Sequence, residues 1–198
     1  MISVSGKIWT QQKVNKNLVE KAKQDYGLGD FLSQLIISRN YDISEIYGIH
    51  NNQKLTNIFK DDKDYQKASL IILNSINNNE NICILGDYDV DGACATSLLV
   101  RYFIHINQKH YFYIPDRVAD GYGASKKLFQ KLILKKPKLV IMVDCGSTSN
   151  EAIDYLNKHN IRSIIIDHHE INKPYPKSDV IINPKKEFIK KESSLLCA

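Results

Sequence analysis

Apolar residues follow two different patterns along the chain, and the change comes near residue 80. From there on, short and largely apolar runs alternate with stretches of helical periodicity. The strand-like runs are Ile82–Leu85, His110–Ile114, Leu139–Val143, Arg162–Ile166 and Val180–Ile182. Strands without an alternating polar face are buried on both sides, as in a parallel sheet covered by helices. The pattern therefore predicts an α/β fold that is doubly wound (Rossmann-like), with a mostly parallel sheet of about five strands flanked by helices.

The remaining apolar positions recur at helical spacing. Between the strands we expect helices over 93–106, 125–134, with Ser125 as N-cap, and 149–159. Before residue 80, helical spacing runs from Leu18 to Ile36, over a short segment at 43–49, and from Asp64 to Ile76. We therefore expect two domains: a helical N-terminal extension over 1–79 and a core domain over 80–198.

Composition limits the classes of protein that need to be considered. The chain has 198 residues, of which 43% are hydrophobic and 25% charged, so it can bury a core and is not expected to be disordered. No apolar run approaches the roughly 20 residues that span a bilayer, and the N-terminus lacks the apolar segment of a secretory signal. We expect a cytoplasmic protein with no membrane partner.

Net charge and cysteine content narrow the possible partners and sites only slightly. The net charge of +5 permits a polyanionic partner without requiring one. The four cysteines form no CxxC pair, which favours buried reduced thiols over a disulfide framework or a zinc site. The lysine clusters at 126–138 and 185–191 are interpreted as solvated faces.

Candidate chemistry lies where three of the expected strands end. The segments that follow them are Gly86–Gly92 (GDYDVDG), Asp144–Gly146 and Asp167–Glu170. In an open α/β sheet, ligands bind in the crevice beyond the carboxyl ends of the strands. Five aspartates and two histidines should therefore converge on one edge: Asp87, Asp89, Asp91, Asp144, Asp167, His168 and His169.

Such a cluster requires positive charge, because aspartates with pKa values near ~3.9 are ionised at neutral pH and repel one another. Carboxylates with imidazoles suit Mn²⁺ or Mg²⁺, and two such ions about 3.5–4 Å apart clamp an in-line displacement at phosphorus. Asp89 and Asp91, two apart in an extended loop, can point to one side. Asp144 can bridge both metals, His168 can complete one coordination shell, and His169 can contact the substrate phosphate.

The same residues allow other interpretations. Taken alone, Asp144 is more often a turn or helix-cap residue, so the prediction depends on three strand ends carrying the set together. An EF-hand loop is rejected, because Leu98 occupies the position of the bidentate glutamate. A haloacid-dehalogenase-like phosphatase, with Asp87 as covalent nucleophile, stays open as a minor alternative.

The segments GDYDVDG, VDCG (143–146) and DHHE (167–170) resemble the first three signature blocks of the DHH phosphoesterase superfamily. The segment IPDR (114–117), followed by GYG (121–123), makes the chain similar to the RecJ-like branch of single-strand-specific 5′→3′ exonucleases. The resemblance implies Mn²⁺- or Mg²⁺-dependent hydrolysis of phosphodiesters from the 5′ end of single-stranded DNA, with two ions in the complete site. It also implies a role in DNA repair and recombination.

The resemblance also implies residue roles. It assigns metal binding to Asp89, Asp91, Asp144 and His168. It places two further residues in the same catalytic centre, Asp87 and His169. The nucleic-acid path is expected at Arg117, Gly121, Tyr122 and Gly123.

The chain departs from the family pattern at its C-terminal segment, Ser193–Ala198. In RecJ-like proteins a similar Leu-Cys-Ala segment opens a helix, and a further metal-binding aspartate lies beyond it. We therefore expect the core domain to be a truncated DHH-type catalytic core. Two alternatives stay open: half of a split enzyme that works with a separately encoded C-terminal half, or an inactive remnant of a disrupted exonuclease gene. Either would leave Leu195–Cys197 as an apolar surface.

Overall fold

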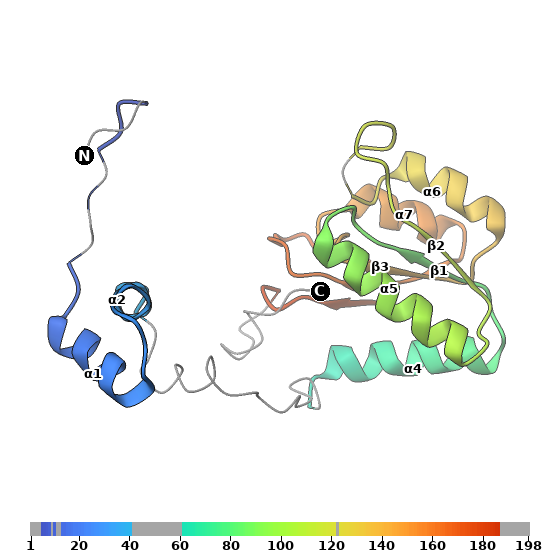
Figure 1. The fold of residues 1–198 in the computed structure, drawn as a ribbon. Coiled ribbons are helices and arrows are strands. Elements are labelled where there is room, and N and C mark those ends of the chain that lie inside the picture. Colours follow the sequence, from blue (N-terminus) through green and yellow to red (C-terminus); the bar gives the residue numbers. More distant parts are fainter. Residues whose placement is uncertain (1–4, 9, 11–12, 41–60, 122, 187–198) are drawn as a thin grey trace. The chain divides into compact units, whose positions relative to one another are not determined.

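The computed structural model describes residues 5–8, 10, 13–40, 61–121 and 123–186 (Figure 1). The chain divides into two compact units, Met1–Thr56 and Asn57–Ala198. The helix expected at 43–49 and the C-terminal apolar segment lie outside the described residues.

The first unit contains a pair of helices, α1 (Lys16–Tyr26) and α2 (Asp30–Ser38). The side chain of Asn15 caps α1 by accepting hydrogen bonds from the backbone nitrogens of Asn17 and Leu18. Gly27 ends this helix in the left-handed conformation, with φ of 64°. A small core joins the two helices through the side chains of Ala22, Leu28 and Ile36.

The second unit is built on a five-stranded parallel sheet with the order β2-β1-β3-β4-β5. Its strands are β1 (Ile82–Leu85), β2 (His110–Tyr113), β3 (Leu139–Val143), β4 (Arg162–Ile166) and β5 (Val180–Ile182). The predicted α/β fold is confirmed. All strands run in one direction, so the loops that follow β1, β3 and β4 meet at one edge of the sheet.

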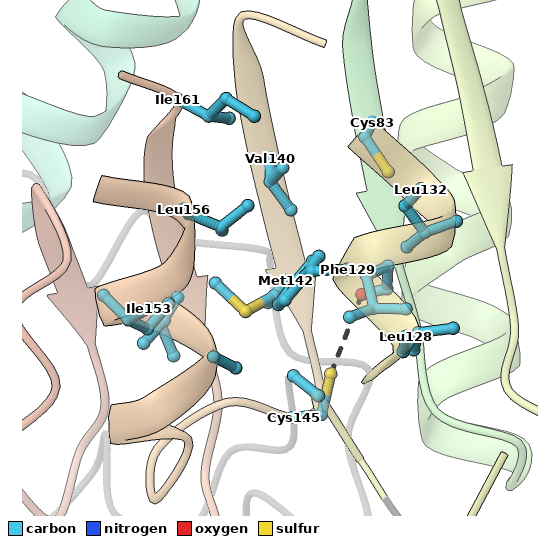
Figure 2. Packing of buried hydrophobic residues seen from close by; sticks show 14 of the residues in the cluster. Cys83, Leu128, Phe129, Leu132, Val140, Met142, Cys145, Ile153, Leu156 and Ile161 are labelled. Carbon is cyan, nitrogen blue, oxygen red and sulfur yellow. Dashed lines mark hydrogen bonds between the residues drawn. The ribbon is translucent and has the colours of Figure 1, made fainter. Parts of the chain in front are cut away.

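Helices cover both faces of this sheet. The helices α4 (Lys63–Asn77) and α5 (Val90–His105) pack on one face, where Ala68 and Phe103 contribute to a core with Ile82 and Ile141. The other face carries α6 (Lys126–Leu132), the short 3-10 helix η1 (Ile133–Lys135) and α7 (Asn150–Lys158). Figure 2 shows this second core, in which the side chains of α6 and α7 pack on β3, with the labelled residues Leu128, Phe129, Ile153, Leu156, Val140 and Met142.

The helix α4 was expected in the N-terminal extension, yet it lies on the sheet. Its Ala68 is buried, Lys67 Nζ donates to the carbonyl of Asp179 at 2.6 Å, and Asp64 pairs with Lys186 at 2.7 Å. In the sequence, the division between the two compact units falls between Thr56 and Asn57. The domain boundary expected from the sequence stays a prediction.

The cysteines are more varied than expected. Cys83 and Cys145 are free and buried in the sheet core, and burial raises the pKa of the Cys83 thiol to about 12. Cys94 is free but exposed on α5, contrary to the expectation of buried thiols. In the part of the chain that the structure describes, no helix combines the length and apolar character needed to cross a membrane.

Candidate metal centre

Three aspartates stand directly beyond the ends of adjacent strands and are nearly inaccessible to solvent. Asp87 follows β1 and is 1% exposed, Asp144 follows β3 and is 0% exposed, and Asp167 follows β4 and is 3% exposed. The parallel register brings these strand ends together, since Leu85 pairs with Met142 and Val143 with Ile166. The expected convergence of the three loops is therefore present.

Asp144 lies at the centre of the cluster and carries unsatisfied polar atoms. Its backbone nitrogen donates to the carbonyl of Ile166 at 2.8 Å, while neither carboxylate oxygen has a hydrogen-bond partner among the described residues. His168 Nε2 lies 3.1 Å from Oδ1 without hydrogen-bond geometry. Burial, reinforced by the neighbouring Asp89, raises the pKa of Asp144 to about 6, although both histidines oppose this. A buried carboxylate without partners is costly, and it fits the ligand of a cation.

Two groups of three side chains share Asp144. One contains Asp87, Asp89 and Asp144, the other Asp144, His168 and His169. Within each group, one ligand atom per residue lies within 4.8 Å of the others. Carboxylate oxygens with imidazole nitrogens form a donor set that suits Mn²⁺ or Mg²⁺. The residues present therefore fit a divalent metal.

The position of Asp89 follows from the start of α5. Asp89 is the N-cap, and its Oδ1 accepts a hydrogen bond from the backbone nitrogen of Gly92 at 3.0 Å. This hydrogen bond is the largest cause of the lowered pKa of Asp89. The cap keeps an ionised carboxylate beside the buried Asp144.

Asp91 lies outside both groups. The expected extended loop over Asp89 and Asp91 is wrong, because α5 begins at Val90 and places Asp91 in its first turn. Residues two apart around a helix start do not face the same side. The assignment of Asp91 as a metal ligand stays a prediction.

Asp167 contacts both histidines of the second group through its carboxylate. Its Oδ1 accepts from the backbone nitrogens of His168 at 2.8 Å and His169 at 3.1 Å, and it lies 2.7 Å from His169 Nδ1. Its Oδ2 accepts from the backbone nitrogen of Ser147 at 3.0 Å. Burial alone would raise the pKa of Asp167, but these hydrogen bonds outweigh it and the pKa is lowered. Conversely, burial lowers the pKa of His169, but Asp167 outweighs burial and the pKa is raised.

The segment that follows β2 approaches the site through Arg117. The guanidinium carbon of Arg117 lies 5.5 Å from the ring centroid of Tyr88, which stands between Asp87 and Asp89. Gly121 and Gly123 both adopt left-handed backbone angles, with φ of 82° and 69°. Tyr122, the fourth residue expected on the nucleic-acid path, lies outside the described residues.

Two aspartates fix the shape of this segment. Asp116 Oδ1 accepts from the backbone nitrogens of Val118 and Ala119, both at 2.8 Å. Asp120 Oδ2 accepts from the hydroxyl of Tyr113 at 2.6 Å, and Oδ1 accepts from Lys131 Nζ at 3.0 Å. Asp116 thus forms a local turn, whereas the side-chain donors to Asp120 lie 7 and 11 residues away in sequence and cannot be recognised from the local pattern.

We expect the Asp120→Asn variant to lose stability in a pH-dependent way. The Tyr113 hydroxyl and then Lys131 lower the pKa of Asp120 from 3.8 to about 2 in the folded chain. The stabilisation is therefore present above pH ~4 and is lost as the pH falls towards 2. Urea unfolding at stepped pH should show the difference between wild type and variant shrinking over this range, and Tyr113→Phe should show the same trend at smaller amplitude. A difference that does not vary with pH would contradict this account.

Comparison with known proteins identifies the family. The family model described as the DHH family, N-terminal domain, matches residues 81–197, which is more than half of the chain. The chain belongs to the DHH family. The resemblance inferred from the signature blocks is thereby confirmed, and the haloacid-dehalogenase-like alternative is left without support.

Several relatives of this DHH-family chain share a name. The single-stranded-DNA-specific exonuclease RecJ of Bacillus subtilis is 27% identical over 179 residues, which cover 89% of this chain and 23% of the relative. The exonuclease of the same name from Escherichia coli is 31% identical over 120 residues, covering 60% of this chain and 21% of the relative. The chain thus spans less than a quarter of the length of these relatives.

Solved structures agree with this membership. An exonuclease RecJ bound to manganese matches with a TM-score of 0.61 and 27% identity, covering 66% of this chain and 34% of the other. RecJ from Thermus thermophilus in complex with Mn²⁺ matches with a TM-score of 0.62 over 86% of this chain and 24% of the other. At 20% identity, the second match shows the common fold alone.

Proposed function

We propose that this DHH-family chain carries the metal-binding part of an exonuclease that hydrolyses single-stranded DNA from the 5′ end, in DNA repair and recombination. The observation that carries the proposal is the buried Asp144, which has no hydrogen-bond partner among the described residues and belongs both to a group of carboxylates and to a group with two histidines. Relatives named as single-stranded-DNA-specific exonucleases support the substrate. A relative bound to manganese supports the metal.

In this proposal Mn²⁺ or Mg²⁺, as two ions in the complete site, is held by Asp89, Asp144 and His168, with Asp91 as a further ligand. When bound, the ions neutralise the carboxylates and polarise the phosphodiester. The chain's own contribution is to hold the carboxylate ligands in fixed positions. The N-cap hydrogen bond holds Asp89, and burial without hydrogen bonds leaves Asp144 open to a cation.

Asp87 and His169 complete the proposed catalytic centre. Asp167 Oδ1 faces His169 Nδ1 at 2.7 Å, which favours a proton on that nitrogen and orients the ring. His169 would then contact the substrate phosphate. Arg117, with Gly121, Tyr122 and Gly123, would guide the strand to this centre. Arginine suits that role because it pairs with phosphate and stacks on aromatic rings.

The test compares the chain with its Asp89→Ala variant in Mn²⁺ binding and in nucleotide release from 5′-phosphorylated single-stranded DNA. We expect loss of this carboxylate to weaken Mn²⁺ binding by more than about 100-fold and to abolish release, as chelation with EDTA should. Asp154→Ala, which removes an exposed carboxylate of α7, is the matched control and should behave as wild type. No binding by the wild type, or binding equal in Asp89→Ala, would overturn the proposal.

A further arm of the assay concerns the partner. The chain spans less than a quarter of its RecJ relatives, and we propose that residues corresponding to the rest of those relatives complete the catalytic core and can be supplied as a separate C-terminal half. Release that begins only after the remaining part of a RecJ relative is added as a second polypeptide would support this split enzyme. Mn²⁺ binding without release under both conditions would favour the inactive remnant.

A further inference from the structure

One buried side chain ties together two loops of the candidate metal centre from outside both. Asn183 follows β5 and is 1% exposed. Its amide nitrogen donates to Ser147 Oγ at 2.8 Å, in the loop after β3, and to the carbonyl of His169 at 3.0 Å, in the loop after β4. Its Oδ1 accepts from the backbone nitrogen of Lys185 at 2.8 Å. Both N–H groups and the amide oxygen are therefore satisfied.

Asn183 and Asp167 act on the same two residues through complementary groups. Asp167 accepts from the backbone nitrogens of Ser147 and His169. Asn183 donates to the side-chain oxygen of Ser147 and to the carbonyl of His169. The backbone of His169 is thus held at both its N–H and its C=O. This leaves little freedom to a residue whose ring belongs to the group with Asp144 and His168.

We infer that Asn183 is a positioning residue that holds His169 in the metal centre. The inference rests on the proposed function, because it takes the group of Asp144, His168 and His169 as that centre. The chemistry requires an amide at this position. An aspartate of the same shape would set a carboxylate oxygen against the His169 carbonyl and leave that carbonyl without its donor, whereas the Ser147 hydroxyl can turn and donate to the new carboxylate.

The decisive variants are Asn183→Asp, which keeps the shape and removes the donors, and Asn183→Ala, which removes the whole amide. Gln108→Ala is the matched control. Gln108 is also buried, and its Nε2 bridges the carbonyls of Glu80 at 2.6 Å and Lys109 at 3.0 Å, before β2 at the other end of the sheet. Asn183→Ala loses three hydrogen bonds of a buried amide, Gln108→Ala loses two, and Asn183→Asp loses the one to the His169 carbonyl. All three variants should therefore lower the melting temperature.

Two measurements separate positioning from general loss of stability. The first is the set of ¹⁵N resonances of the His169 ring in the metal-free chain, assigned by their absence in His169→Gln. We expect these resonances to shift in both Asn183 variants and to stay in place in Gln108→Ala. The second is Mn²⁺ affinity by calorimetry, which should fall by about ten-fold or more in Asn183→Asp and stay unchanged in Gln108→Ala.

The ring resonances and the Mn²⁺ affinity test different claims. Ring resonances that do not move in either Asn183 variant would overturn the inference, whatever the metal affinity. Equal loss of Mn²⁺ affinity in Asn183→Asp and Gln108→Ala would also overturn it, because the effect would then follow stability alone. Absence of Mn²⁺ binding by the wild type would overturn the proposed function, and the ring resonances would still decide whether Asn183 holds His169.

Discussion

Replacing Asp144 with asparagine should stabilise the metal-free chain while abolishing Mn²⁺ binding. The pKa of this carboxyl group is raised from 3.8 to about 6 when the chain folds, first by burial and then by Asp89. A raised pKa contributes stability below pH ~4, and that contribution is lost as the pH rises through 6. At neutral pH the wild type therefore buries an unfavourable negative charge, which asparagine lacks. We expect a gain of about 2 kcal/mol in the free energy of unfolding of Asp144→Asn at pH 7 in EDTA.

The sign of this difference should reverse when metal is present. An ion that binds only the folded chain stabilises it by about 2.7 kcal/mol at a concentration 100 times its Kd. The wild type should gain this stabilisation in Mn²⁺, and Asp144→Asn should not. Urea unfolding at pH 4, 5.5 and 7, with EDTA or Mn²⁺, measures both effects, with Asp154→Asn as the control for loss of a carboxylate. A variant less stable than wild type at pH 7 in EDTA would contradict the prediction.

Asp144 lowers the stability of the metal-free fold but is expected to bind the metal. This conflict explains why the sequence could predict where the site lies in the sheet. A buried carboxylate is rarely retained at a strand end for packing, because it destabilises the fold that contains it. The combination of continuous apolar strands with acidic residues at their ends therefore predicted both the sheet and the edge where the site lies. That inference required only the parallel direction of the strands.

Other features depend on contacts that local sequence does not contain. The periodicity over 64–76 showed which side of α4 is apolar, but it could not show that this side packs on the sheet. The start of α5 was placed three residues late, because Val90 to Gly92 have weak helix propensity and the cap at Asp89 decides the boundary. Asn183 gave no signal at all, since its partners lie 36 and 14 residues away in sequence.

Substitution of Gly92 by alanine should disrupt the site and much of the fold around it. A Cβ at this position in the first turn of α5 would lie 2.6 Å from both the backbone nitrogen and the backbone oxygen of Asp87. The backbone at Asp87 and the first turn of α5 must separate to relieve this overlap, and these two segments flank Asp89. We expect a loss of at least about 3 kcal/mol in the free energy of unfolding, measured by urea titration, with a parallel loss of Mn²⁺ binding.

Gly86→Ala provides the contrast that identifies the cause. The Cβ added there would lie 2.0 Å from Thr96 Oγ1, a side-chain atom that is buried without a hydrogen-bond partner among the described residues. Truncating Thr96 to alanine removes that atom at little cost, so the double variant Gly86→Ala/Thr96→Ala should recover most of the stability lost in Gly86→Ala. Thr96→Ala should not rescue Gly92→Ala, because the overlap there is with backbone. Equal rescue of both glycine variants would show that loosening of α5, and not the close approach of Gly92 to Asp87, determines their stability.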